Sequence, residues 1–366
     1  MKKSINVLII LILLMGTILI GCSESVSNEP VYERYSYRFL DAFDTVTQVV
    51  GYAESEEEFM EYANFIEERT WELHRLFDRF NSYEGVNNIK TINDQAGVEP
   101  VKVEQEILDM IQLAKDWYGP SGGKMNIAIG ALSSLWSEYR EEGSYDPQNA
   151  KLPPREKLED AAQHIDHDKV IIDHEAGTVF LEDPKMSLDV GALAKGYAAE
   201  LVVNEVSEKG LAAGIISLGG NIKAFGKPLD GDRDRWGVGI LDPDKQIFDV
   251  VSENKDTIFI NDASVVSSGD YQRYYIVDGE IIHHIIDPDT LMPGNFYRSM
   301  TVITKHSGLA DYLSTAAFLL PFEESYALID STEDVEGFWI MKDGSVKFTD
   351  GLTDKLRSQG ASGTDD

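Results

Sequence analysis

The stretch from Ser187 to Tyr197 constrains this chain most, because it prescribes a strand end, a tight turn and a helix in succession. Apolar residues at 186–188 predict the strand end, and small and apolar residues recur at helical spacing over 192–203. Gly191 then marks a strand-to-helix turn. Such turns expose backbone N–H groups that bind anions, and Lys195 would add a positive charge. Taken alone, a glycine and a lysine near a helix start fit a purely structural role better.

The first 22 residues predict the location of the protein. Lys2 and Lys3 precede a nearly continuous apolar run over 7–20, which Gly21 and Cys22 follow. This is the pattern of a signal peptide that ends in a lipobox, with Cys22 as the lipid anchor. A transmembrane anchor is the alternative, although the run is short for a span. We therefore expect a lipid-anchored protein at the cell membrane that faces the extracytoplasmic side.

Composition limits the partners. Cys22 is the only cysteine, so internal disulfides and multi-cysteine metal sites are excluded. The formal net charge is -32, and this charge argues against nucleic acid because its phosphates would be repelled. A small ligand that carries phosphate would need a local positive charge at its site, from a metal ion or a lysine.

The 366 residues suffice for one large domain or about two. We expect a polar tether at 23–36, the folded domain at 37–348 and a polar tail at 349–366. Ser55 and Glu58 form a capping box before a long amphipathic helix, whose aromatic residues up to Phe80 are expected in the core. A second helix is predicted from about Glu104 to Trp117. Strands are predicted at 170–172, 178–181, 214–218, 222–225 and 236–240. Helices thus prevail before residue 165 and strands after it, which predicts an α+β fold.

His283 and His284 head the densest polar cluster. A histidine can take a proton from a hydroxyl near neutral pH. Neighbouring residues in an extended segment point to opposite faces, so only one of the two can serve a given site, and joint metal binding is not expected. One buried and one exposed histidine without a chemical role is the structural alternative.

Asp311 and Thr315 stand four residues apart on a predicted helix, so their side-chain oxygens share a face. A carboxylate and a hydroxyl suit a hard cation such as Mg²⁺, which prefers oxygen ligands and keeps sites for water and phosphate. The alternative is an aspartate near a helix N-terminus and a threonine that merely packs.

Taken together, seven stretches resemble the ApbE-type flavin transferases, the FAD:protein FMN transferases, including their bacterial lipoprotein members. They follow the family order within about residues 40–320. The stretches are 43–45, 123–126, 189–197, 218–222, 267–271, 284–290 and 310–315. The resemblance implies a T-fold-like core with a smaller α/β part.

The resemblance also implies roles for individual residues. It implies contacts with FAD at Phe43, Lys124, Met125, Asn126, Asp189, Lys195 and Ile285. It implies Mg²⁺ ligands at Asp311, Thr315 and the backbone oxygen of Ala192, with Ser314 adjoining the metal. It implies His284 as the catalytic base, with Asp287 to orient it and Lys195 to add positive charge.

The implied reaction is Mg²⁺-dependent transfer of FMN from FAD to a threonine or serine hydroxyl of an acceptor protein, with AMP leaving. The acceptor would carry an FMN-binding domain, as in redox-pump subunits and extracellular electron-transfer proteins. Two other functions stay open: hydrolysis of FAD to FMN and AMP, and a non-catalytic lipoprotein that binds FAD.

The chain departs from the family pattern at three places. Asn126 stands where aspartate is usual, Leu291 where glycine is usual, and Ser267 where threonine is frequent. None of these changes removes a predicted metal ligand or the lysine. At the C-terminus, Ser362 and Thr364 lie in a stretch loosely like the acceptor sites of such enzymes, which suggests the hypothesis that one of them takes FMN in cis.

Overall fold

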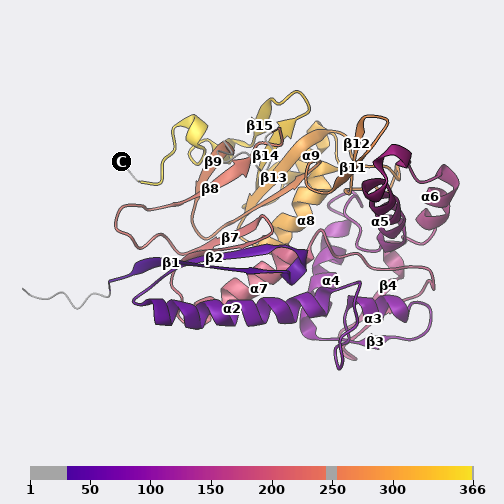
Figure 1. The fold of residues 1–366 in the computed structure, drawn as a ribbon, viewed down its shortest axis with the longest axis horizontal. Coiled ribbons are helices and arrows are strands. Elements are labelled where there is room, and N and C mark those ends of the chain that lie inside the picture. Colours follow the sequence, from indigo (N-terminus) through magenta and orange to yellow (C-terminus); the bar gives the residue numbers. More distant parts are fainter. Residues whose placement is uncertain (1–30, 245–253, 365–366) are drawn as a thin grey trace, which may run out of the picture. The chain divides into compact units, whose positions relative to one another are not determined.

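An antiparallel sheet of eight strands forms the centre of the fold, in the order β1-β2-β6-β7-β10-β13-β14-β15 (Figure 1). This computed structural model describes residues 31–244 and 254–364. The predicted signal peptide and Cys22 lie outside these residues. The strands are β1 (Glu33–Leu40), β2 (Val46–Ala53), β6 (Gly214–Leu218), β7 (Asn221–Phe225), β10 (Ser264–Gly269), β13 (Tyr297–Thr304), β14 (Glu336–Met341) and β15 (Val346–Phe348). β1 begins at Glu33, within the stretch that we expected to be a tether.

The largest core cluster joins this sheet to several helices, among them α2 (Glu56–Phe77), α7 (Ala194–Glu208), α8 (Ser307–Phe318) and α9 (Phe322–Asp330). The capping prediction for α2 is confirmed in part: Ser55 Oγ accepts the Glu58 N–H at 3.2 Å, whereas the Glu58 carboxylate accepts from Glu54 N rather than from the cap residue. Phe80 is a correction, because α2 ends at Phe77 and the Phe80 side chain is 67% exposed. No helix within 31–244 and 254–364 is long and apolar enough to cross a membrane.

A second core cluster lies between the large sheet and a two-stranded sheet, β8 (Trp236–Leu241) and β9 (Asn254–Ile260). The segment expected as a polar tail contributes to this cluster. It contains η4 (Asp350–Leu352) and η5 (Arg357–Gln359), and it buries Leu352 and Leu356 completely. The Gly363 carbonyl accepts hydrogen bonds from the amides at 234 and 235. Residues 349–364 therefore pack on the domain, because two leucines in a polar stretch are enough to anchor it.

The rest of the fold consists of elements that lie mostly between α2 and α7 in the sequence (Figure 1). Its helices are α3 (Ile89–Asp94), α4 (Gln105–Tyr118), α5 (Gly130–Tyr145) and α6 (Arg155–Ala162), with short 3₁₀ turns η1 (Ala42–Asp44), η2 (Pro147–Asn149) and η3 (His167–Lys169). Its strands are β3 (Val101–Lys102), β4 (Val170–Asp173), β5 (Thr178–Leu181), β11 (Tyr274–Val277) and β12 (Glu280–His283). The predicted second helix and the 170–181 hairpin are confirmed, and so is the mixed α+β class.

Candidate functional site

Asp189 is held in the turn that leads into α7. Its amide donates to the Ile127 carbonyl at 2.8 Å, and its Oδ1 accepts the Gly191 amide at 3.0 Å. Its Oδ2 accepts Ser133 Oγ at 2.7 Å and forms an ion pair with Arg79. Burial raises the pKa of Asp189, but Arg79 and these hydrogen bonds outweigh burial and hold the pKa below its usual value. Asp189 is therefore an ionised carboxylate with a fixed direction.

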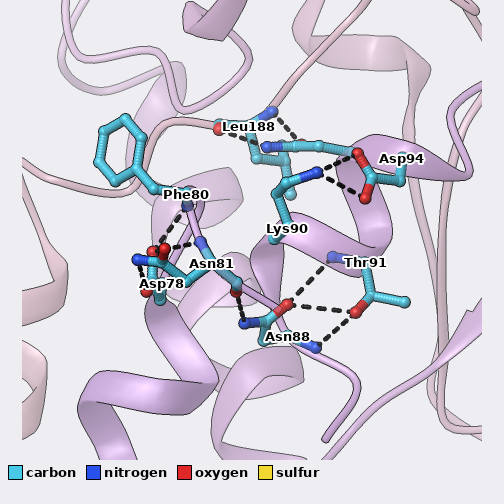
Figure 2. A network of polar contacts seen from close by, with 9 residues as sticks. Asp78, Phe80, Asn81, Asn88, Lys90, Thr91, Asp94 and Leu188 are labelled. Atoms are coloured by element: carbon cyan, nitrogen blue, oxygen red, sulfur yellow. Dashed lines mark hydrogen bonds and ion pairs between the residues drawn. The ribbon is translucent and has the colours of Figure 1, made fainter. Parts of the chain in front are cut away.

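Figure 2 shows a network of polar contacts that includes sequence neighbours of both partners of this ion pair, Asp78 and Phe80 beside Arg79 and Leu188 beside Asp189. The side chain of Asn93 on α3 forms two bonds to the backbone of Leu188, accepting its amide at 2.6 Å and donating to its carbonyl at 3.0 Å. Asp78 accepts the Phe80 amide at 2.6 Å and so shapes the turn that presents Arg79. Asn88 caps α3 through the Thr91 amide at 3.0 Å. The network thus fixes the chain on either side of the site before any ligand binds.

The N-terminal turn of α7 packs directly on α8. The Gly196 amide donates to Asp311 Oδ2 at 2.9 Å, and a Cβ at Gly196 would lie 2.4 Å from the Ser307 carbonyl oxygen. Only glycine permits this approach. Lys195 donates to the Gly191 carbonyl at 3.1 Å and lies close enough to Asp311 to stabilise its charge.

Asp311 is buried, with 4% of its surface exposed. Burial raises its pKa, although Lys195, the Gly196 amide and Asn221 act in the opposite direction. The protein groups around Asp311 therefore do not fully compensate the cost of burying its negative charge. A bound cation would supply it, so the carboxylate fits the predicted metal site.

Thr315, another predicted metal ligand, stands one turn after Asp311 on α8. The Thr315 hydroxyl is half-buried and 3.2 Å from Ser268 Oγ. Ser314 is engaged by the protein, because its hydroxyl donates to the Asp311 carbonyl at 2.9 Å and lies 2.8 Å from Ser268 Oγ. No three His, Cys, Asp or Glu side chains cluster as a metal site in the described part of the chain. The donor set of one carboxylate, one hydroxyl and the Ala192 carbonyl suits Mg²⁺, which keeps several waters and binds phosphate.

The two neighbouring histidines have different surroundings, as predicted. His283 is buried: its Nε2 lies 2.7 Å from the Gly294 carbonyl and its Nδ1 accepts the Ile285 amide. His284 is partly exposed, and its buried Nδ1 has no hydrogen-bond partner among the described residues. Burial, followed by the charges of Arg273, His283, Arg140 and Lys195, lowers the pKa of His284 to about 3. The imidazole is therefore neutral at pH 7.

Asp287 does not orient His284, which corrects one expectation. Its Oδ1 accepts Lys124 Nζ at 2.9 Å and the Asp289 amide at 3.0 Å. Lys124 also pairs with Asp289 at 2.7 Å. Burial lowers the pKa of Lys124, but Asp289 and Asp287 outweigh it and raise the pKa. The ion pair between Lys124 and Asp287 thus joins the loop before α5 to the segment after His284. Asp287 serves as an anchor of that segment.

The residues expected to line a flavin pocket come from three segments. Phe43 sits in η1 with a left-handed backbone (φ 54°), and its amide donates to His74 Nδ1 at 3.0 Å. Met125 and Ile285 are buried in the main cluster, and the Met125 carbonyl accepts the Tyr312 hydroxyl at 2.8 Å. Asn126 is buried as well. Its Nδ2 donates to the Ile165 carbonyl at 2.8 Å and its Oδ1 accepts the Ala128 amide at 2.9 Å. The Asn126 side chain therefore fixes its own loop.

Three arginines at the site were not predicted from the sequence. Arg79 pairs with Asp189, whereas Arg140 on α5 and Arg273 before β11 lie near His284. Lys195 also acts on His284, and it acts on Asp311 as well. No local spacing pattern connects residues 79, 140, 195 and 273, so only the tertiary fold brings them together.

Comparisons with known proteins find similarity over most of this chain. The sequence model of the ApbE family matches residues 43–339. The FAD:protein FMN transferase of Treponema pallidum is 32% identical over 283 residues, covering 74% of this chain and 75% of that protein. A protein of the same name from Klebsiella pneumoniae is 31% identical over 280 residues, covering 74% and 83%.

Solved structures are also similar. The ApbE protein from Thermotoga maritima has a TM-score of 0.75 at 25% identity, covering 87% of this chain and 98% of that one. The apo form of the flavinyl transferase ApbE from Pseudomonas stutzeri has a TM-score of 0.71 at 20% identity, covering 87% and 95%. The second likeness shows the fold alone.

The role of Asn126 yields a stability prediction. Asn126→Asp replaces the donor to Ile165 by a carboxylate that faces a carbonyl in a buried loop, so the free energy of unfolding at pH 7 should fall by about 1–3 kcal/mol. Burial raises the pKa of the new carboxyl in the folded state, so part of the loss should be regained as the pH falls and the carboxyl protonates. Denaturant unfolding at pH 7 and pH 5 measures both effects. The same change at the exposed Asn64 is the control, and an equal loss in the two variants would contradict the prediction.

Proposed function

Because this chain belongs to the ApbE family, we infer that it is a FAD:protein FMN transferase, which moves FMN from FAD to a hydroxyl of an acceptor protein and releases AMP. The observation that carries this conclusion is the gathering of Asp189, Lys195, His284 and Asp311 at one site. These four residues are 122 positions apart at most in the sequence, from 189 to 311, and belong to three separate segments. As part of the same proposal, the core of the fold is T-fold-like with a smaller α/β part.

We propose that the cofactor is Mg²⁺, held by Asp311, Thr315 and the Ala192 carbonyl, with Ser314 supporting the site from α8. The undercompensated charge of buried Asp311 supports this assignment. When bound, Mg²⁺ would neutralise negative charge on the phosphate oxygens of FAD. Lys195, which acts on both Asp311 and His284, adds a second positive charge to the same region.

His284 accepts the proton of the acceptor hydroxyl in this proposal, because it is neutral and partly exposed. The hydroxyl oxygen forms a bond to the FMN-side phosphorus, and the bond from that phosphorus to the bridging oxygen breaks. AMP therefore leaves with the bridging oxygen, and the acceptor retains FMN through a phosphoester.

Binding of the flavin is assigned to the segments around Phe43, Lys124–Asn126, Asp189 and Ile285. Phe43 and Ile285 offer apolar surface, and Asp189 offers a fixed, ionised carboxylate as a hydrogen-bond acceptor. Lys124 and Asn126 contribute by holding the two loops, since their side-chain polar atoms are bonded to the protein. The acceptor is proposed to be an FMN-binding domain of a redox-pump subunit or an extracellular electron-transfer protein.

The location is likewise a proposal, and it rests on residues 1–22 of the sequence. Cys22 carries the lipid that anchors the protein to the outer side of the cell membrane. Cys22→Ala should move the protein from the membrane fraction to the soluble fraction or leave it with an uncleaved leader. Fractionation with intact-mass analysis checks this, and unchanged mass and membrane association in the variant would contradict the lipid anchor.

The transferase is tested with the protein lacking residues 1–22, FAD, Mg²⁺ and an FMN-binding domain, followed by intact-mass analysis of the acceptor. We expect a mass gain of one FMN, and a loss of about 100-fold or more in rate for Asp311→Ala. Asp160→Ala, at an exposed position on α6, is the control and should leave the rate unchanged. Release of AMP without an adduct would point to hydrolysis, and FAD binding without AMP would point to a non-catalytic protein.

The surroundings of His284 yield a prediction for pH dependence. A base must be unprotonated, and a pKa lowered to about 3 keeps His284 unprotonated throughout pH 5–8. The value of kcat/KM, which reports the free enzyme, should therefore show no acidic decline near pH 6.5. The negative phosphates of bound FAD favour the protonated form of His284 and so raise its pKa in the complex. Any acidic decline should therefore appear at higher pH in kcat than in kcat/KM. A midpoint near 6.5 in kcat/KM that disappears in His284→Asn would contradict the prediction.

A further inference from the structure

Three hydroxyl groups meet between β10 and α8. Ser268 stands near the end of β10, and Ser314 and Thr315 are neighbours on α8. Ser268 Oγ lies 2.8 Å from Ser314 Oγ and 3.2 Å from Thr315 Oγ1. Successive residues of a strand point to opposite faces, and the Ser267 hydroxyl accordingly contacts the Thr301 hydroxyl of β13, at 2.8 Å. Ser268 therefore connects β10 to the segment that carries the predicted metal ligands.

The directions of these hydrogen bonds follow from a count of protons, because each hydroxyl can donate only one. Ser314 Oγ donates its proton to the Asp311 carbonyl at 2.9 Å. Ser268 is therefore the donor in its bond to Ser314, and its own proton is used there. Thr315 is in turn the donor in its bond to Ser268. The chain of donors thus begins at Thr315 and ends at the carbonyl of Asp311.

This order leaves the lone pairs of the Thr315 oxygen available. A hydroxyl binds a hard cation through an oxygen lone pair, so its proton has to point away from the cation. Within 31–244 and 254–364, Ser268 is the one hydrogen-bond partner of the Thr315 hydroxyl. Without the Ser268 hydroxyl, the Thr315 hydroxyl would lose the acceptor that holds its proton in this direction.

The end of β10 has a fixed position from which Ser268 can act. Ser268 lies opposite Met300 in the pairing of β10 with β13. Two residues further on, the Asp270 amide donates to the Arg298 carbonyl at 3.1 Å, and the Asp270 carboxylate pairs with the Arg298 guanidinium at 2.9 Å. Asp270 is buried, with 3% of its surface exposed. The stretch 267–271 therefore holds Ser268 in place against α8.

We propose that Ser268 is a positioning residue of the cation site, which holds the Thr315 hydroxyl with its lone pairs toward the cation. This inference rests on the proposed Mg²⁺ site. Ser268 acts through Thr315 and takes no part in proton transfer. Groups that orient a metal ligand in this way typically change metal affinity by about 10–100-fold when they are removed.

The proposal is tested by binding of Mn²⁺ to the full-length protein in detergent, without FAD and without an acceptor. Mn²⁺ takes the same oxygen ligands as Mg²⁺, and its paramagnetic resonance signal reports the free ion. Ser268→Ala should weaken Mn²⁺ binding about tenfold or more, because the orientation of the Thr315 hydroxyl is lost. Ser268→Thr keeps the hydroxyl and should retain most of the affinity. Mg²⁺ should displace the bound Mn²⁺.

The neighbouring Ser267 provides a matched control. Ser267→Ala also removes a hydroxyl that lies 2.8 Å from a partner hydroxyl, but this partner belongs to β13. Mn²⁺ binding should be unchanged in this variant. Denaturant unfolding without metal measures the stability that each alanine variant loses, so a loss of affinity is separated from a loss of stability. Equal weakening of Mn²⁺ binding by Ser267→Ala and Ser268→Ala would overturn the proposal.

A double-mutant cycle tests whether Ser268 acts through Thr315. Thr315→Val removes the hydroxyl, keeps the shape of the side chain and should weaken Mn²⁺ binding. In this background, Ser268→Ala should cause no further loss, because no hydroxyl is left to orient. Losses that add in the double variant would contradict the proposal.

The assay also separates this inference from the proposed function, because it requires no transfer of FMN. Mn²⁺ binding that depends on Ser268 in a protein that modifies no acceptor would refute the transferase and leave the positioning role standing. Transfer of FMN with Mn²⁺ binding unaffected by Ser268→Ala would do the reverse. A protein that binds no Mn²⁺ would contradict both the proposed metal site and the role of Ser268.

Discussion

The contact between Gly196 and Asp311 is the constraint on which the site depends. A buried carboxylate accepts the amide of a residue that has no side chain, and this brings the start of α7 against α8. The neighbour of Gly196 is placed as a result, because Lys195 lies close enough to Asp311 to stabilise its charge. The residues of 189–197 and those of 311–315 belong to separate elements. The close approach at Gly196 is what brings the two stretches to one site.

Local charge in the site opposes the charge of the whole chain. The chain carries -32, yet Arg79 pairs with Asp189, Lys195 acts on Asp311, and Arg140, Arg273 and Lys195 act on His284. Of the two carboxylates, Asp189 is neutralised by Arg79, and Asp311 is the better placed to bind a cation. An anionic substrate therefore meets a positive region, and the acidic surface keeps other polyanions away.

The sequence predicted what depends on short spacing. The turn and helix at 187–203, the shared face of Asp311 and Thr315, and the different environments of His283 and His284 all follow from periods of 3.6 or 2. The sequence did not predict the contacts between distant segments. Arg79 reaches Asp189 because α2 ends at Phe77, and the same end leaves Phe80 in solvent. Asp287 bonds to Lys124, 163 residues away, and no pattern in either segment indicates that pairing.

Two residues that depart from the family pattern, Leu291 and Asn126, are stabilised by contacts with neighbouring residues. Leu291 adopts the left-handed backbone that glycine favours (φ 64°), at a cost of about 1–3 kcal/mol. Its side chain is buried beside Trp136, whose indole donates to the Leu291 carbonyl at 3.0 Å, and burial of a leucine contributes roughly 1.5–3 kcal/mol. The turn after Thr290 thus keeps its form. Asn126 likewise replaces a charge by a donor that the Ile165 carbonyl requires. Because both residues stabilise loops rather than face Asp311 or His284, their presence is compatible with an active enzyme, and the sequence difference reflects local packing rather than lost chemistry.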